Sequence, residues 1–247
     1  MNYKRKDKRA NNEVRQLEIL TEYTSYAEGS VLVSAGNTKI ICTASIEKTV
    51  PDWRLGNDKK AIHGWLSSEY RMLPRATDVR RKRANNNVDG RTQEIQRFIG
   101  RSLRSVVDFS SFLDHTIWID CDVIQADGGT RTASINGGFV SLIIALRKAY
   151  QSGEINEFPV KNFLAAVSVG IVNDIPLLDL VYEEDKIADV DMNVVMLDSG
   201  EIVELQGAAE VKTYSREQLN KMIDLAELGI RTNISKQKNI LGSVLSG

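Results

Sequence analysis

The sequence predicts an α+β protein in which helices pack on β-sheets. Runs of alternating apolar and polar residues are followed by segments with helical apolar spacing, and this order occurs twice along the chain. The chain has 247 residues, of which 42% are apolar, so it can bury a sizeable core. With only 4 prolines and no low-complexity linker, it shows no internal boundary, and we expect residues 1–247 to form a single domain of two packed halves.

The period of the apolar residues places the elements of the first half. Three strands and, after a long basic loop, one helix are expected at about residues 17–20, 31–34, 38–46 and 92–107. Ile119, Cys121 and Val123 alternate with aspartates, which predicts a further strand. Apolar residues at helical spacing after Gly138 predict a helix that reaches Tyr150.

The second half repeats this order. Four strands and a helix are expected at about residues 163–172, 177–182, 190–197, 201–206 and 215–229. Ser215 and Gln218 have the spacing of a capping box, which marks the start of the last helix.

The segment Gln125–Ser134 has the features of an anion-binding loop. Gly128 and Gly129 let the backbone approach a ligand, and the first amides of a helix are unpaired donors at the positive end of its dipole. The same residues also suit an ordinary turn and helix cap with Arg131 in solvent. The spacing matches neither the Walker A loop nor the dinucleotide fingerprint. The phosphate-binding candidates are Gly129, Thr130, Arg131, Thr132 and Ser134.

Charge is divided unevenly along the chain. Residues 1–108 carry 21 Lys and Arg against 13 Asp and Glu, whereas residues 109–247 carry 11 against 20. This asymmetry indicates one surface for a polyanion and another for a cation, unless the halves simply neutralise each other on folding or assembly.

The basic stretch Trp53–Asp89 combines arginines with the aromatic residues Trp53, Trp65 and Tyr70. This composition suits phosphate contacts and base stacking on single-stranded RNA. A solvated or subunit-bridging loop is the alternative. The RNA-binding candidates are Arg71, Arg75, Arg80 and Arg83.

Two aspartates could converge on a metal ion. Asp185 lies in an acidic run, and Asp191 lies in the strand that follows, opposite its apolar set. Carboxylates from a loop and a strand can hold one Mg²⁺, completed by substrate phosphate oxygens; a solvated acidic turn is the alternative. Arg91 follows Asp89-Gly90 at a helix start, where its side chain can reach a ligand outside the helix end.

Other classes of site are not supported. Cys42 and Cys121 lie in apolar strand-like runs and are expected to be buried thiols, not a disulfide or a metal site. His63 and His115 are too isolated for a zinc site or a hydrolase triad. The polar N-terminus is not a signal peptide and no apolar run could span a membrane, so a cytoplasmic protein is expected.

Several long blocks of the sequence, in the same order, closely resemble the bacterial ribonuclease PH family, and the similarity covers nearly the full length. The blocks are Ala27–Ser34, Glu69–Thr77, Gly90–Arg104, Ile119–Ser134 and Asp189–Met196.

This resemblance implies the ribonuclease PH fold, of the kind of ribosomal protein S5 domain 2, with two related βαβα halves and helices packed on mixed β-sheets. It implies a phosphorolytic 3′ to 5′ exoribonuclease and tRNA nucleotidyltransferase that trims precursor tRNA and takes part in tRNA and rRNA processing. Inorganic phosphate would be the co-substrate, nucleoside diphosphates the products, and the assembly a homohexamer built as a trimer of dimers.

Roles for individual residues follow from the same resemblance. Arg91, Thr130 and Arg131 would hold the attacking phosphate, and Gly128, Gly129, Thr132 and Ser134 would shape the loop. Asp185 and Asp191 would bind Mg²⁺, or one of them would give a proton to the leaving 3′ oxygen. Arg75, Arg80 and Arg83 would guide the tRNA.

The chain departs from the family pattern at three positions. Lys8 and Val211 stand where glycine is usual, and Asp89 stands where serine is common. A catalytically inactive ring subunit with the same fold is the competing hypothesis, and retention of the proposed catalytic residues Arg91, Arg131, Asp185 and Asp191 counts against it. Polymerisation as the main direction cannot be separated by sequence, because both directions use one site.

Overall fold

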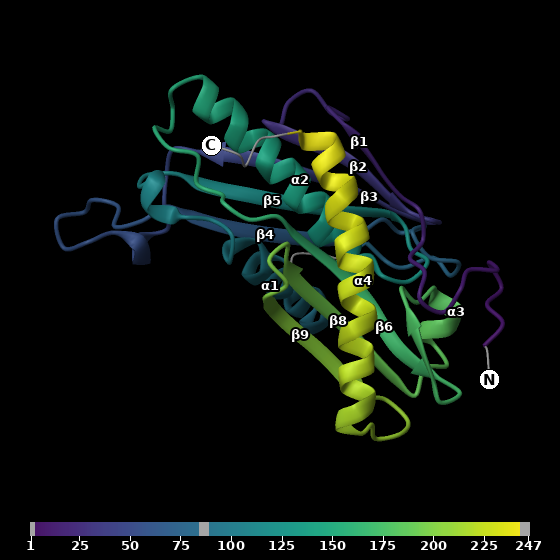
Figure 1. Ribbon diagram of the computed structural model, residues 1–247. Helices are drawn as coiled ribbons and strands as arrows, with labels where there is room; N and C mark the ends of the chain where they lie inside the picture. Colours follow the sequence, from purple (N-terminus) through teal and green to yellow (C-terminus); the bar gives the residue numbers. More distant parts are fainter. Residues whose placement is uncertain (1–2, 84–88, 243–247) are drawn as a thin grey trace.

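The computed structural model describes residues 3–83 and 89–242, whose arrangement is shown in Figure 1. The first half contains β1 Leu17–Thr21, β2 Gly29–Ala35, β3 Thr38–Glu47, β4 Trp65–Met72, α1 Gly90–Arg104, β5 Thr116–Gln125 and α2 Thr130–Gln151. The second half contains β6 Leu164–Val172, β7 Ile175–Leu178, α3 Tyr182–Asp185, β8 Val190–Leu197, β9 Ile202–Ala209 and α4 Arg216–Leu241. The predicted α+β class is confirmed.

Two sheets organise the molecule. The first has the order β1-β2-β3-β5-β4, in which β4 and β5 are parallel and the other neighbours antiparallel, so this sheet is mixed. The parallel pair needs a crossover connection, which α1 provides. The second sheet has the order β7-β6-β8-β9 and is antiparallel throughout.

Helix α2 joins the two halves. It packs on β2, β3 and β5 of the first sheet and on β6 and β8 of the second, and it is buried from Thr132 to Leu146. Helix α4 packs on β6, β7 and β8 of the second sheet, in front of which it lies in Figure 1, and it also contacts α2. One cluster of buried apolar residues therefore runs through both halves. None of the helices in the described ranges is long and apolar enough to cross a membrane.

The stretch between Trp53 and Asp89 is not a loop throughout, contrary to expectation. It contains β4, in which Leu66 and Tyr70 are buried. The alternation was hidden because Ser67, Ser68 and Glu69 separate these two residues. Pairing with β5 makes the strand in spite of its weak apolar pattern.

Two other boundaries differ from the predicted ones. Helix α4 continues twelve residues past 229, because Gly229 is not a stop: a Cβ there would lie 2.9 Å from side chains of Val14 and Leu178, so this glycine permits close packing. The strand expected at 177–182 ends at Leu178, because Asp179 turns the backbone into the left-handed region with φ of +54°.

Candidate active site

The loop between β5 and α2 packs directly on the chain of the second half. Gly128 and Gly129 have φ of +74° and +63°, values that glycine adopts without strain. A Cβ on Gly128 would lie 2.6 Å from the carbonyl oxygen of Leu180, just before α3. Among the described residues, no hydrogen bond uses the amides of Gly129 and Thr130 as donors. These amides are therefore available to an anion at the start of α2.

Arg131, on the first turn of α2, is held by two elements from different halves. Its Nη1 donates to Oε1 of Gln206 on β9 at 2.8 Å and lies 3.5 Å from Oε1 of Glu94 on α1. The amide of Gln206 donates in turn to Glu94 at 2.6 Å. The guanidinium is partly buried and so is fixed beside the loop, not free in solvent.

Tyr70 is a member of this site that the sequence placed in a loop suited to base stacking. It is buried, and its hydroxyl donates to Oγ1 of Thr130 at 2.9 Å. Burial raises the pKa of the Tyr70 phenol to about 12, although Arg91 and Arg131 act in the opposite direction. The phenol therefore stays protonated and orients the hydroxyl of Thr130 at the start of α2.

Thr132 and Ser134 lie behind the loop. Oγ1 of Thr132 donates to the carbonyl of Gly129 at 3.0 Å, within the first turn of α2. Ser134 is fully buried, and its carbonyl faces the thiols of Cys42 and Cys121 in the core, both of which are buried as expected. Thr132 is therefore placed to shape the loop, whereas the contacts of Ser134 lie in the core.

Asp185 and Asp191 bring carboxylates from the second half to the same region. Asp185 ends α3 and Asp191 lies near the start of β8. Burial raises the pKa of Asp185, against the fields of Arg91 and Arg131. Burial also raises the pKa of Asp191, with a further contribution from Asp185, and Arg131 opposes it. These mutual effects mean that the two arginines and the two aspartates share one region, although they come from both halves.

In the remainder of the acidic run, Glu183 is exposed and lies 3.6 Å from Lys6, whereas the other two carboxylates are buried and paired. Glu184 is buried and paired with Arg5 at 2.6 Å, and Asp189 is paired with Lys212 at 3.1 Å. Asp185 and Asp191 are thus the members of the run that form no ion pair with another described residue.

The donor set fits a hard cation that also binds substrate. Within residues 3–83 and 89–242, no three His, Cys, Asp or Glu side chains lie close enough to hold a metal by themselves. Mg²⁺ commonly takes one or two carboxylates, waters and phosphate oxygens, so a pair of aspartates beside an anion loop is sufficient. Burial is the main cause of the raised pKa values of Asp185 and Asp191, and a bound cation would favour the ionised form of both carboxyls.

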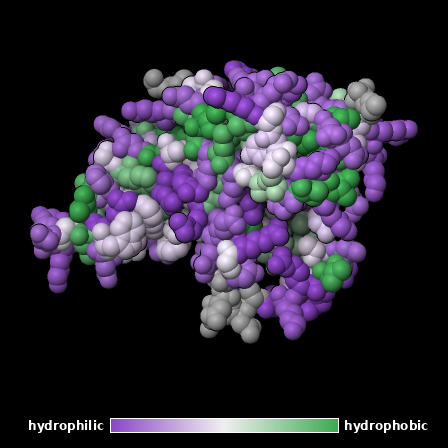
Figure 2. All heavy atoms as spheres, turned by 90° about the horizontal axis from the view of Figure 1, so that it is seen from below, coloured by the Kyte–Doolittle hydropathy of each residue, from purple (hydrophilic) through white to green (hydrophobic). Residues whose placement is uncertain are grey.

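The arginines predicted to bind RNA do not all lie together. Arg75, Arg80 and Arg83 are exposed in the segment that follows β4, and they form no ion pair with another described residue. Arg71 instead pairs in register with Asp122 on the sheet face opposite Tyr70. Burial raises the pKa of Asp122, Glu69 adds to the rise, and Arg71 opposes it. The underside of the molecule in Figure 2 is mainly hydrophilic.

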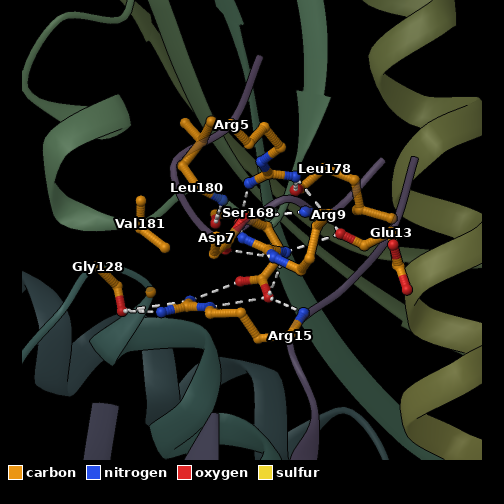
Figure 3. A network of polar contacts seen from close by, with 12 residues as sticks. Arg5, Asp7, Arg9, Glu13, Arg15, Gly128, Ser168, Leu178, Leu180 and Val181 are labelled. Carbon is orange, nitrogen blue, oxygen red and sulfur yellow. Dashed lines mark hydrogen bonds and ion pairs between the residues drawn. The ribbon is translucent and has the colours of Figure 1, made fainter. Parts of the chain in front are cut away.

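Three arginines of the N-terminal segment were not recognised as structural from the sequence. Arg5 donates to Glu184, and Arg9 and Arg15 both bind Asp179 (Figure 3). Arg5 and Arg15 are almost completely buried. No periodic pattern could have found them, because their partners are more than 160 residues away in sequence.

The structure shows the local environment of two of the residues that depart from the family pattern, Asp89 and Lys8. Asp89 caps α1, with its carboxylate accepting from the amide of Thr92 at 2.7 Å, so it serves as well as serine. Lys8 has φ of +65°, a conformation that favours glycine.

Each half of the chain matches its own protein-family model. The models of the 3′ exoribonuclease family match domain 1 at residues 13–148 and domain 2 at residues 162–228. The chain is 54% identical to ribonuclease PH of Bacillus pumilus over 98% of this chain and 99% of that protein. It is 53% identical to ribonuclease PH of Bacillus subtilis over 98% of each.

Solved structures share the fold at low sequence identity. Rice Rrp46 superposes with a TM-score of 0.74 at 17% identity, covering 98% of this chain and 100% of that one. A chain of the Archaeoglobus fulgidus exosome with RNA bound to the active site superposes with a TM-score of 0.77 at 20% identity, covering 94% and 92%.

Proposed function

Because the chain belongs to the 3′ exoribonuclease family, we propose that the loop and the two aspartates form one phosphorolytic site. The protein is a phosphate-dependent 3′ to 5′ exoribonuclease that trims the 3′ end of precursor tRNA and releases nucleoside diphosphates. The observation that carries the proposed site is the convergence of Arg91 and Arg131 from one half with Asp185 and Asp191 from the other.

Inorganic phosphate would bind at the start of α2. The free amides of Gly129 and Thr130 donate to its oxygens, and the guanidinium groups of Arg91 and Arg131 balance its charge. Bound in this way, phosphate is held in line with the terminal phosphodiester of the RNA. Such positioning supplies much of the rate of a phosphoryl transfer.

The reaction exchanges one phosphorus–oxygen bond for another. An oxygen of inorganic phosphate attacks the phosphorus of the last phosphodiester, and the bond to the 3′ oxygen of the preceding nucleotide breaks. The last nucleotide leaves as a nucleoside diphosphate, and the shortened RNA keeps a free 3′ hydroxyl. Asp185 and Asp191 both have raised pKa values, which suits either of them to give the proton that this hydroxyl needs.

Holding Mg²⁺ as ionised carboxylates is the alternative role of Asp185 and Asp191. When bound, the ion would neutralise charge on the phosphate oxygens. Since a phosphodiester is exchanged for a diphosphate, the reaction is reversible, and nucleoside diphosphates can be added to a 3′ end.

The exposed arginines Arg75, Arg80 and Arg83 would contact the RNA backbone of the precursor tRNA or of other structured RNA. We place Arg71 outside this surface because it lies beside Asp122. The two halves would act as a single domain, and a precursor tRNA substrate would place the protein in the cytoplasm.

The assembly would be a homohexamer built as a trimer of dimers. The relation to ribonuclease PH supports it, and so do large apolar side chains that the single chain leaves exposed near β1, among them Leu20 and Tyr26. Native mass spectrometry measures the number of chains directly.

The experiment that tests the function uses a 3′-tailed tRNA, Mg²⁺ and purified protein, with and without inorganic phosphate. Nucleoside diphosphates should appear only when phosphate is present. Monophosphates would mean hydrolysis and a different mechanism. RNA binding without any release would identify an inactive ring subunit.

A further inference from the structure

We propose that Arg15 is a positioning residue, which orients the amides of the phosphate-binding loop through its contacts with the loop carbonyls. Asp179, from the other half of the molecule, fixes Arg15 in place. The proposal deepens the proposed function, since it assigns a device that prepares the same loop for phosphate.

Arg15 and Asp179 form a buried pair with three hydrogen bonds. The backbone amide and Nε of Arg15 both donate to Oδ2 of Asp179, at 2.7 and 3.0 Å, and Nη2 donates to Oδ1 at 2.6 Å. The side chains are 5% and 10% exposed. Arg9 also contacts this carboxylate and donates to the carbonyl of Asp179 (Figure 3). The guanidinium of Arg15 therefore has one orientation.

The terminal nitrogens of the Arg15 guanidinium also donate hydrogen bonds to the carbonyls of the loop. Nη1 of Arg15 donates to the carbonyl of Asp127 at 2.6 Å, and both terminal nitrogens lie 3.4 Å from the carbonyl of Gly128. The hydroxyl of Thr38 donates to the Gly128 carbonyl at 2.7 Å from the neighbouring strand. Two successive carbonyls of the loop are thus fixed toward Arg15 and Thr38.

Because of the geometry of the peptide bond, fixing these carbonyls also fixes the direction of the loop amides. In a planar trans peptide, the carbonyl and the following N–H point in opposite directions. Fixing the carbonyls of Asp127 and Gly128 toward Arg15 therefore directs the amides of Gly128 and Gly129 away from it. The amide of Gly129 has no acceptor among the described residues. It is left as a donor that is oriented before phosphate arrives, so binding does not have to order it.

The same N-terminal segment also reaches the aspartates. Arg5 binds Glu184 through two nitrogens, at 2.9 and 2.6 Å, one residue before Asp185. Gly128 touches the backbone just before α3, which ends at Asp185. The segment from Arg5 to Arg15 therefore contacts both the loop, which belongs to the first half, and the residue before Asp185, which belongs to the second half. It fixes the position of the loop relative to Asp185.

Stability alone is a poor reason for this arrangement. A buried ion pair loses much of its Coulomb energy to desolvation, and well-packed apolar residues are often equally stabilising. Arg15 also adds little charge for phosphate, because the carboxylate of Asp179 neutralises it. What apolar residues could not supply is the orientation of the two carbonyls.

The test compares Arg15→Lys and Thr38→Val with the wild type. Lysine keeps the charge but not the fork that reaches both Asp179 and the loop. Valine removes the hydroxyl that donates to the Gly128 carbonyl and accepts from the amide of Asp127 at 2.9 Å, so both of its contacts with the loop are lost. Arg15→Lys should raise the KM for phosphate by about tenfold and Thr38→Val by a few-fold, while kcat at saturating phosphate changes much less. The ¹⁵N–¹H signal of Gly129 should move at correspondingly higher phosphate concentration.

Gln237→Ala is the matched control. Gln237 is fully buried in α4 and bonded to the carbonyl of Leu164, so its loss destabilises the fold without touching the loop. Its KM for phosphate should stay that of the wild type. An unchanged KM in both folded test variants, or an equal rise in Gln237→Ala, would overturn the proposal.

Two readouts separate this proposal from the function it rests on. A wild type that releases no nucleotide would refute phosphorolysis. The phosphate titration of the Gly129 signal needs no turnover, so it still decides whether Arg15 prepares the loop: equal midpoints in wild type and Arg15→Lys would show that it does not.

Discussion

Replacing Gly128 by alanine should separate the phosphate loop from α3. Two costs add at this position. The left-handed φ of +74° costs a residue with a Cβ about 1 to 2 kcal/mol. The new Cβ would also meet three backbone atoms of residues 180–182 at 2.6 to 2.8 Å, and relieving such overpacking costs about 1 to 3 kcal/mol. The total of about 2 to 5 kcal/mol is large for a single methyl group.

Gly153→Ala is the matched control for this change. Gly153 has φ of +76°, but a Cβ there would meet no atom within 4 Å. It should therefore show only the conformational cost. For a chain of this size, about 1 kcal/mol lowers the thermal midpoint by about 2 to 4 °C. Thermal melts of the two variants should thus differ by the steric cost alone.

Activity should separate the two variants more sharply than stability does. Because the clash displaces the loop from the chain that leads to Asp185, Gly128→Ala should lose most phosphate-dependent release at temperatures where it is still folded. Gly153→Ala should keep the wild-type rate. A Gly128→Ala protein that has the same thermal midpoint as Gly153→Ala and retains full activity would refute the packing of the loop against the chain before α3 as the basis of the site.

Other predictions follow from single contacts. Arg131→Gln removes a charge-assisted contact and should raise the KM for phosphate by about tenfold to a hundredfold; a phosphate titration with an unchanged KM would contradict its assignment. Asp191→Asn should stop turnover yet leave RNA binding intact. Burial raises the pKa of Asp191 in the folded state, so its ionised form costs stability above that pKa. Without Mg²⁺, this variant should therefore melt at a higher temperature than the wild type at neutral pH. The gain should shrink as the pH falls below the raised pKa and vanish below the ordinary pKa of the side chain, 3.8. Lys8→Gly should raise the thermal midpoint by the equivalent of about 1 kcal/mol, whereas Lys8→Ala, which keeps the Cβ, should not. Neutralising the exposed arginines Arg75, Arg80 and Arg83 should lower the slope of log affinity for RNA against log salt concentration by about 0.7 for each lost phosphate contact. An unaltered slope would argue that the segment is purely structural.

Local patterns were sufficient for much of the fold. Helix α1, strand β8 and the capped start of α4 were predicted because each carries a clear apolar period or cap of its own. The anion loop was visible for the same reason, since two glycines between a strand and a helix are a local signal. The roles assigned to its side chains stay predictions.

What the sequence could not supply depends on partners far away in the chain. Strand β4 exists through pairing with β5, and the function of Tyr70 is visible only when Thr130 is beside it. The N-terminal arginines look like a solvated basic tail until Glu184 and Asp179 are in place. The helix expected to end at about 229 continues, because Gly229 allows close packing against residues that are distant in sequence.

The most direct test of a single phosphorolytic site follows the phosphate itself. Unlabelled 3′-tailed tRNA is incubated with ³²P-labelled inorganic phosphate, Mg²⁺ and either wild type or Asp191→Asn. If the loop and the aspartates act together, the label appears as the β-phosphate of released nucleoside diphosphates with the wild type, and with the variant none appears. Release of unlabelled monophosphates, or equal labelling by the variant, would contradict the account.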